Sequence, residues 1–100
     1  MKDNPLLHRI KNIVLDSFKE EDIEIILFGS RARGDNTPYS DVDIALLPQG
    51  KGKNIQKKIT LLRYFLEESN IPYKVEIIDL SSASKSFREQ VLKEGIIWRN

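Results

Sequence analysis

Apolar residues recur at helical spacing in three stretches of the chain. This period predicts helices over about residues 5–20, over about residues 54–68, and from the residue after Ser84 to Gly95, where the glycine ends the third helix. Pro5 suits the first turn of the first helix, and Ser84 is a suitable N-cap for the third. The apolar positions that carry the period are Leu6, Ile10, Ile13, Val14 and Phe18, then Ile55, Ile59, Leu62 and Leu66, and finally Phe87, Val91 and Leu92.

Shorter apolar runs between these stretches predict strands at residues 25–28, 42–47, 73–79 and 96–98. Residues 30–34 are expected to form a single helical turn, followed by a loop at 35–38. Strands that alternate with helices predict an α/β (α+β) fold, in which a small mixed β-sheet of about four strands packs against three helices. One hundred residues suffice for one such core, so residues 1–100 are expected to form a single domain.

The charge balance of the chain is nearly even, with 16 Lys and Arg residues against 15 Asp and Glu residues and a formal net charge of +1. Such a balance gives no long-range attraction to nucleic acid or to a membrane surface, so neither is expected as a direct partner. The sequence contains no cysteine, which excludes disulfides and thiolate metal sites and fits a cytoplasmic location. No apolar run reaches the roughly 20 residues that a membrane-spanning helix needs.

Two aspartates interrupt the apolar run of the second predicted strand. Asp41 and Asp43 are two residues apart, so in a strand their side chains point to the same face, about 7 Å apart at the backbone. At about 6 Å and an effective dielectric constant near 20, two carboxylates repel by about 2–3 kcal/mol, and a bound Mg²⁺ ion would remove that repulsion. The alternative is an exposed edge strand with solvated acids, but the apolar residues 44–47 argue against full exposure.

Gly29 and Ser30 stand where the first predicted strand meets the helical turn. Glycine lets another group approach the backbone closely, and a serine that opens a helical turn can offer its N–H and hydroxyl to an anion. The alternative is a plain strand-to-helix turn. A phosphate-binding P-loop is excluded, because Asp35 and Asn36 follow Gly34 where that motif requires lysine and then serine or threonine.

The third predicted strand adds two further acids, Glu76 and Asp79. Alternation places them on opposite faces of the strand, so only one of them can join Asp41 and Asp43. Taken alone, each is typical of a solvated surface carboxylate.

The segments GSRARG, SDVDIA and, in a later strand, KVEIIDL together resemble the minimal nucleotidyltransferases of the DNA polymerase β-like nucleotidyltransferase superfamily. The resemblance extends from residue 25 to the terminal GIIWR, which is nearly the whole chain. Each segment is common by itself, whereas their order and spacing together are specific. The resemblance implies a nucleotidyltransferase-like fold and an enzyme that transfers a nucleotide.

In that family a glycine and a serine hold the nucleotide triphosphate, and the matching residues are Gly29 and Ser30. The two aspartates of the D-x-D pair bind divalent metal, and they match Asp41 and Asp43. A third carboxylate on a neighbouring strand activates the attacking hydroxyl and binds metal, and it matches Glu76.

Glu76 departs from the family pattern, in which this position is usually aspartate. Its extra methylene adds about 1.5 Å of reach, which strains a site of near-octahedral geometry. Glu76 could therefore bind metal weakly, act through water or have no role, and Asp79 is the reserve candidate.

As a phosphate ligand Arg33 is favoured over Arg31, because positions two apart in a helical turn do not share a face, and solvated arginines are the alternative. Ser40 either contacts phosphate or caps the loop before the strand.

The reaction implied by the resemblance is two-metal nucleotidyl transfer, with two Mg²⁺ ions as cofactor and ATP as donor. Such small transferases commonly accompany a helical HEPN-type toxin, and the resemblance implies an antitoxin that attaches AMP to a tyrosine of that toxin in a type VII-like pair. A partner is expected to present the acceptor, and a homo-oligomer is left open. The alternatives are a catalytically weak or inactive module that neutralises its partner by contact alone, and a nucleotide-binding regulatory domain of a larger complex.

Overall fold

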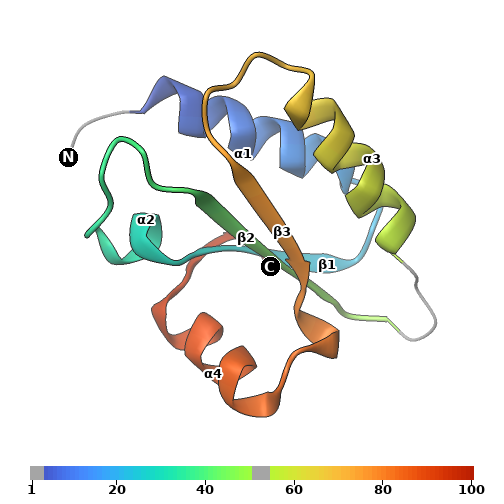
Figure 1. The fold of residues 1–100 in the computed structure, drawn as a ribbon. Helices are drawn as coiled ribbons and strands as arrows, with labels where there is room; N and C mark the ends of the chain where they lie inside the picture. The colour runs from blue at the N-terminus through green and yellow to red at the C-terminus, as the bar shows by residue number, and fades with distance from the viewer. Residues whose placement is uncertain (1–3, 51–54) are drawn as a thin grey trace.

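A computed structural model describes residues 4–50 and 55–100. Within these residues the chain forms four α-helices, one 3₁₀ turn and one four-stranded sheet (Figure 1). The elements in chain order are α1 (Pro5–Ser17), β1 (Ile23–Phe28), α2 (Ser30–Arg33), β2 (Val42–Pro48), α3 (Gln56–Glu67), β3 (Val75–Asp79), η1 (Leu80–Ser82), α4 (Lys85–Glu94) and β4 (Ile96–Arg99). The predicted fold class is therefore confirmed, with the short helical turn α2 as the fourth helix.

The sheet has the strand order β3-β2-β1-β4. β2 and β3 are parallel, whereas β1 pairs antiparallel with both β2 and β4. The sheet is mixed, as predicted, and its two edges are β3 and β4. A parallel pair needs a crossover, which α3 provides between β2 and β3.

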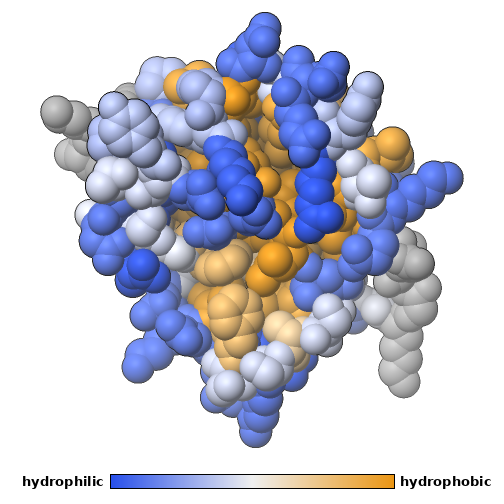
Figure 2. All heavy atoms as spheres, in the orientation of Figure 1, coloured by the Kyte–Doolittle hydropathy of each residue, from blue (hydrophilic) through white to orange (hydrophobic). Residues whose placement is uncertain are grey.

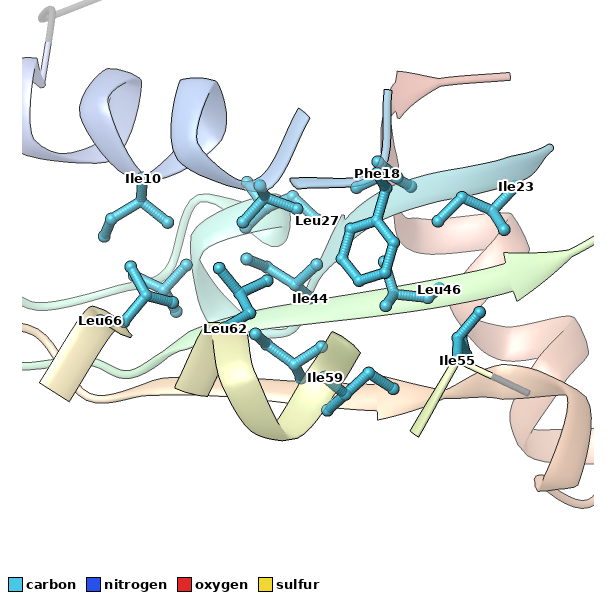
Figure 3. Packing of buried hydrophobic residues seen from close by; sticks show 14 residues of the cluster. Ile10, Phe18, Ile23, Leu27, Ile44, Leu46, Ile55, Ile59, Leu62 and Leu66 are labelled. Atoms are coloured by element: carbon cyan, nitrogen blue, oxygen red, sulfur yellow. The ribbon is translucent and has the colours of Figure 1, made fainter. Parts of the chain in front are cut away.

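Helices cover the two faces of the sheet unequally. α1 and α3 lie on one side and α4 lies on the other (Figure 1). Figure 3 shows the larger core, which lies between the sheet and the helices α1 and α3. There Phe18 packs among isoleucine and leucine side chains. The smaller core under α4 consists of Ile26, Ala45, Leu80 and Val91. Since side chains alternate along β2, Ile44 enters the first core and Ala45 the second.

α4 covers only part of its face. Val91 is buried, but Phe87, which the helical period places on the buried side, is 38% exposed and meets Phe28 edge to face at 6.0 Å between ring centroids. Figure 2 shows apolar surface between hydrophilic side chains, extending from β3 toward α4.

Several predicted boundaries are off by a few residues. α1 ends at Ser17 rather than near residue 20, and the Ser17 hydroxyl donates to the carbonyl of Ile13. β1 begins two residues earlier than predicted, and β3 begins at Val75 because the chain before it is still a loop. The predicted start of the second helix at residue 54 lies outside the described residues. Among the described residues no helix is both long and apolar enough to cross a membrane.

Candidate active site

Asp43 and Glu76 are Cα partners in the parallel pair β2–β3, and Asp43 is also the Cα partner of Phe28 on β1. Partners in adjacent strands project to the same face of the sheet. Phe28 packs against the small core under α4, so both acids lie on the α4 side of the sheet. Asp41 is exposed and lies immediately before β2 begins at Val42.

The backbone at Gly29 takes a conformation that glycine favours, with φ of 77°. A Cβ atom at this position would overlap Oδ2 of Asp43 and would lie 3.2 Å from its Cγ. The carboxylate of Asp43 therefore rests directly against the backbone that leads into α2. The sequence offered Gly29 as a place where another group could approach the backbone, and in the structure that group is the Asp43 carboxylate. The role of Gly29 in holding a nucleotide stays a prediction.

Ser30 begins the predicted helical turn. The carbonyl of Gly29 accepts hydrogen bonds from the N–H groups of Ala32 and Arg33, both at 3.1 Å, and Gly34 ends the turn in the left-handed conformation. The prediction of one turn at residues 30–34 is confirmed. The N–H groups of Ser30 and Arg31 precede these hydrogen bonds and have no partner inside the turn.

Negative charge is concentrated at Asp43. Burial raises the pKa of this carboxyl above its ordinary value, and the charges of Asp41 and Glu76 raise it further. Arg33 and Lys74 act in the opposite direction and lower the same pKa. The three acids thus repel one another, and a cation bound among them would relieve that repulsion.

Oxygen donors of this kind suit Mg²⁺ chemically. The carboxylate of Glu76, however, contacts Lys74, with 3.3 Å between Nζ and Oε1. Within residues 4–50 and 55–100, no three Asp, Glu, His or Cys side chains are arranged so that they could hold one metal ion. Asp41 and Asp43 therefore fit a divalent cation by their chemistry, and Glu76 would have to leave Lys74 to join them.

Arg31 has a role that the sequence reading missed. Its guanidinium donates to the carbonyl of Ser40 from Nε at 3.2 Å and from Nη2 at 3.0 Å, and it lies over the ring of Tyr73 with 4.3 Å to the centroid. These contacts tie Arg31 to the loop that enters β2, so Arg31 helps to position the strand that carries Asp43. An arginine spaced nine residues before a loop carbonyl gives no pattern from which this contact could be read.

Arg33 and Ser40, the other predicted phosphate ligands, already have partners. Arg33 pairs with Asp35 at 3.2 Å and reaches Glu94 at 4.0 Å. The hydroxyl of Ser40 accepts a hydrogen bond from the N–H of Thr37 at 2.9 Å, which is the capping role that the sequence offered as its alternative. Their roles as nucleotide ligands stay predictions.

Asp79 lies apart from the acidic cluster, which consists of Asp41, Asp43 and Glu76. Its Oδ1 accepts hydrogen bonds from the N–H and the hydroxyl of Ser81 at 3.0 and 2.6 Å, and its Oδ2 lies 3.5 Å from the side-chain amide of Gln56 on α3. Asp79 thus begins η1 on the face opposite Glu76, in agreement with the alternation along β3.

Comparison with known proteins gives a consistent result. Residues 10–98 match the family described as polymerase beta, nucleotidyltransferase. The chain is 29% identical over 76 residues to a Haemophilus influenzae protein named as a probable protein adenylyltransferase, MntA. That match covers 76% of this chain and 65% of the relative, so the chain spans just under two thirds of the relative's length.

Two solved structures share the fold. One, described as a minimal nucleotidyltransferase, aligns with a TM-score of 0.71 and 27% identity over 95% of both chains. The other is a complex of a tri-AMPylated Shewanella oneidensis HEPN toxin with an MNT antitoxin, with a TM-score of 0.60 and 25% identity over 91% of this chain and 70% of that chain. The three matches agree with the resemblance carried by the sequence motifs.

Proposed function

The chain belongs to the polymerase beta nucleotidyltransferase family, and on this premise we propose that it transfers AMP from ATP to a hydroxyl of a protein partner. The acceptor is a tyrosine of a HEPN-type toxin, and the chain is the antitoxin of a type VII-like pair. The observation that carries the proposal is that Asp43 lies against the backbone of Gly29 and is the Cα partner of Glu76. The adenylyltransferase name of one relative and the AMPylated toxin in a similar complex support it.

In this proposal the chain's own residues bind and orient the nucleotide. Gly29 leaves room for the Asp43 carboxylate against the backbone that enters the phosphate-binding turn, and Ser30 donates its N–H and hydroxyl to phosphate oxygens. Arg33, whose charge lowers the pKa of Asp43, offsets the charge of the leaving pyrophosphate. Glu76 takes the proton of the acceptor hydroxyl as that oxygen forms its bond to the α-phosphorus.

Asp41, Asp43 and Glu76 are the residues that would hold Mg²⁺. When bound, the two ions supply charge stabilisation to the attacking and leaving oxygens. Without them the carboxylates repel both one another and the triphosphate, which is consistent with the raised pKa of Asp43.

The proposal is tested by mixing the chain with ATP, Mg²⁺ and the protein encoded beside it, and recording the intact mass of each. We expect the partner to gain the mass of AMP, and the Asp43→Asn variant to reduce the rate by about 100-fold or more. The matched control is Asp79→Asn, which changes an acid on the opposite face and should leave the rate unchanged. An unmodified partner in the presence of an intact, folded wild-type chain would contradict the proposal.

A second function, neutralisation of the partner by contact alone, is favoured by the ion pair of Lys74 with Glu76, because the third acid already has a cationic partner. The test is a double variant, Asp41→Asn with Asp43→Asn. If this variant still neutralises the partner in cells, contact is sufficient. If neutralisation disappears while the complex still forms, transfer is required.

A further inference from the structure

A cavity lies on the other face of the sheet from Asp43. It has a volume of about 510 Å³ and is enclosed by the first turns of α1, by α2 and by β4. Its floor includes Leu27 and Ile96, which are Cα partners, and Trp98. Leu27 belongs to the core under α1 and α3, so this cavity is separated from the acidic cluster by the sheet and shares only α2 with it.

The chemistry of the cavity is apolar below and cationic at the rim. Lys11 lies with its Nζ 5.9 Å from the centroid of the Trp98 ring, and Arg31 lines the opposite wall. Neither has a carboxylate partner within the part of the chain that the structure describes, and no Asp or Glu lines the cavity. Because the whole chain has a net charge of only +1, this excess of positive charge is local.

The cavity continues onto a free strand edge. β4 is the last strand in the order β3-β2-β1-β4, so its outer side pairs with no strand of the described chain. Its first two residues, Ile96 and Ile97, are 46% and 51% exposed. An exposed apolar edge of this kind is a template for an added strand, whose alternate side chains could enter the neighbouring cavity.

We infer that β4 and the adjoining cavity form the docking surface for an extended acidic and apolar segment of a protein partner. The segment pairs its backbone with β4, places an apolar side chain against Trp98 and Ile96, and sets a carboxylate beside Lys11. The inference rests on the proposed function, in that it takes the partner to be the protein that presents the acceptor. The surface shares α2 with the nucleotide-binding turn, so the segment would tether the acceptor close to the transferring site without occupying it.

Charge decides between this occupant and a second copy of the chain. A symmetric pairing of two β4 strands would bring Lys11 and Arg31 of both copies to one interface, with no carboxylate among the described residues that line either cavity to offset them. An acidic segment meets the same surface with complementary charge. The apolar side of α3, where Leu61 and Tyr64 are 60% and 65% exposed, is the competing surface and provides a control.

Trp98 is the only tryptophan of the chain, so labelling with fluorotryptophan gives a single ¹⁹F resonance at this surface. The probes are a short blocked peptide of alternating isoleucine and glutamate and the same peptide with lysine in place of glutamate. We expect the glutamate peptide to shift the Trp98 resonance and the lysine peptide to have little effect. In the Lys11→Glu variant the preference should reverse, a gain that loss of folding cannot produce.

The second arm uses the acceptor protein found by the mass experiment. Ile96→Asp and Lys11→Glu should each weaken the complex by about tenfold or more, while the affinity for ATP stays unchanged. Leu61→Asp on α3 should leave the complex intact. The inference is overturned if neither peptide shifts the Trp98 resonance, or if both peptides shift it equally. It is also overturned if light scattering shows that β4 instead pairs two copies of the chain, or if Leu61→Asp alone breaks the complex. Loss of transfer with retained peptide binding would contradict the proposed function and leave this inference standing.

Discussion

Gly29 and Asp43 fit together so closely that any side chain on the glycine would overlap the carboxylate. The two residues belong to neighbouring strands, because Gly29 directly follows β1 and Asp43 lies in β2 opposite Phe28. The contact holds an acid against the turn that is proposed to bind phosphate. It therefore ties the metal-binding and phosphate-binding parts of the proposed site into one rigid unit.

This contact predicts the effect of Gly29→Ala. The variant must strain a backbone with φ of 77° and must also displace the Asp43 carboxylate, so we expect a loss of about 3 kcal/mol in the free energy of unfolding and no transfer activity. Urea unfolding and the mass assay measure the two effects.

Gly34→Ala is the matched control, because Gly34 also has a positive φ, of 88°, but an added Cβ would meet no atom within 4 Å. It should cost about 1–2 kcal/mol through backbone strain alone. In the Gly29→Ala background, a further Asp43→Ala change should recover part of the lost stability. Equal losses in the two alanine variants would show that the contact with Asp43 has no energetic weight.

Asp43 also predicts a pH dependence of stability. Its pKa is raised in the folded chain, so above the ordinary value of 3.8 the unfolded chain ionises first and the folded chain carries a penalty. Wild type should therefore lose stability relative to Asp43→Asn as pH rises through the window between 3.8 and the raised pKa, and the deficit should persist at pH 7. Well below pH 3.8 the two should be equal, because Asp43 is then protonated in both states.

The measurement is urea unfolding of both chains across this pH range in the presence of a chelator. Adding Mg²⁺ at neutral pH should narrow the difference, because only the wild-type site gains from a cation. A variant that is less stable than wild type at pH 7 without Mg²⁺ would mean that Asp43 stabilises the fold rather than burdening it.

Periodicity was sufficient to predict the fold class because most elements bury one consistent face. α4 is the exception: the helical period places Leu92 on the buried side with Val91, but Leu92 is 44% exposed. Along β2, Ile44 and Ala45 enter different cores, and the parity of the same strand places Asp43 with Glu76 and apart from Asp79. The opposition of Glu76 and Asp79 was therefore predictable from β3 alone. Strand order was not, since the pairing of β4 with β1 depends on long-range contacts that leave no local pattern.

Side-chain partners across loops also escaped the sequence. Arg31 and Arg33 were distinguishable by face, but the capture of Arg31 by the Ser40 carbonyl depends on how the intervening loop folds back. The sequence also did not predict that Lys74 competes with a metal ion for Glu76. Residues two apart in a strand share a face throughout the sheet, so their spacing alone does not show that these two side chains form an ion pair. Local charge patterns identify candidates, and only the folded chain shows which of them are already paired.

Lys74 should weaken Mg²⁺ binding. It contacts Glu76 and it lowers the pKa of Asp43, so its positive charge acts on the same carboxylates that a bound cation would contact. We expect Lys74→Met to raise the Mg²⁺ affinity by about two- to fivefold at low ionic strength, in the range that an exposed ion pair allows. Calorimetric titration of Mg²⁺ measures this, and Lys19→Met, which removes an equally exposed partner of Asp16, is the control. An unchanged affinity in Lys74→Met would mean that Glu76 does not contribute to the metal site.

Glu76→Asp restores the residue usual in this family. The shorter side chain releases Lys74 and keeps a carboxylate beside Asp43, so transfer activity should be retained or raised. Initial rates of mass transfer to the acceptor, compared with those of Glu76→Gln, separate the length of the side chain from its charge. Complete loss of activity in Glu76→Asp would show that this site is built around the longer acid.

Asp79→Ala tests which acid of β3 is the third carboxylate. Asp79 holds the N–H and hydroxyl of Ser81 and begins η1, so its removal should cost about 1 kcal/mol of stability through the lost cap. It does not act on the pKa of Asp43, whereas Glu76 does, so Mg²⁺ affinity and the pH dependence of stability should both match wild type. Urea unfolding and Mg²⁺ titration of Asp79→Ala and Glu76→Ala side by side give the comparison. If Asp79→Ala abolished Mg²⁺ binding and Glu76→Ala did not, the roles of the two acids would have to be exchanged. The metal site would then not lie on the face of the sheet that carries Asp43 and Glu76.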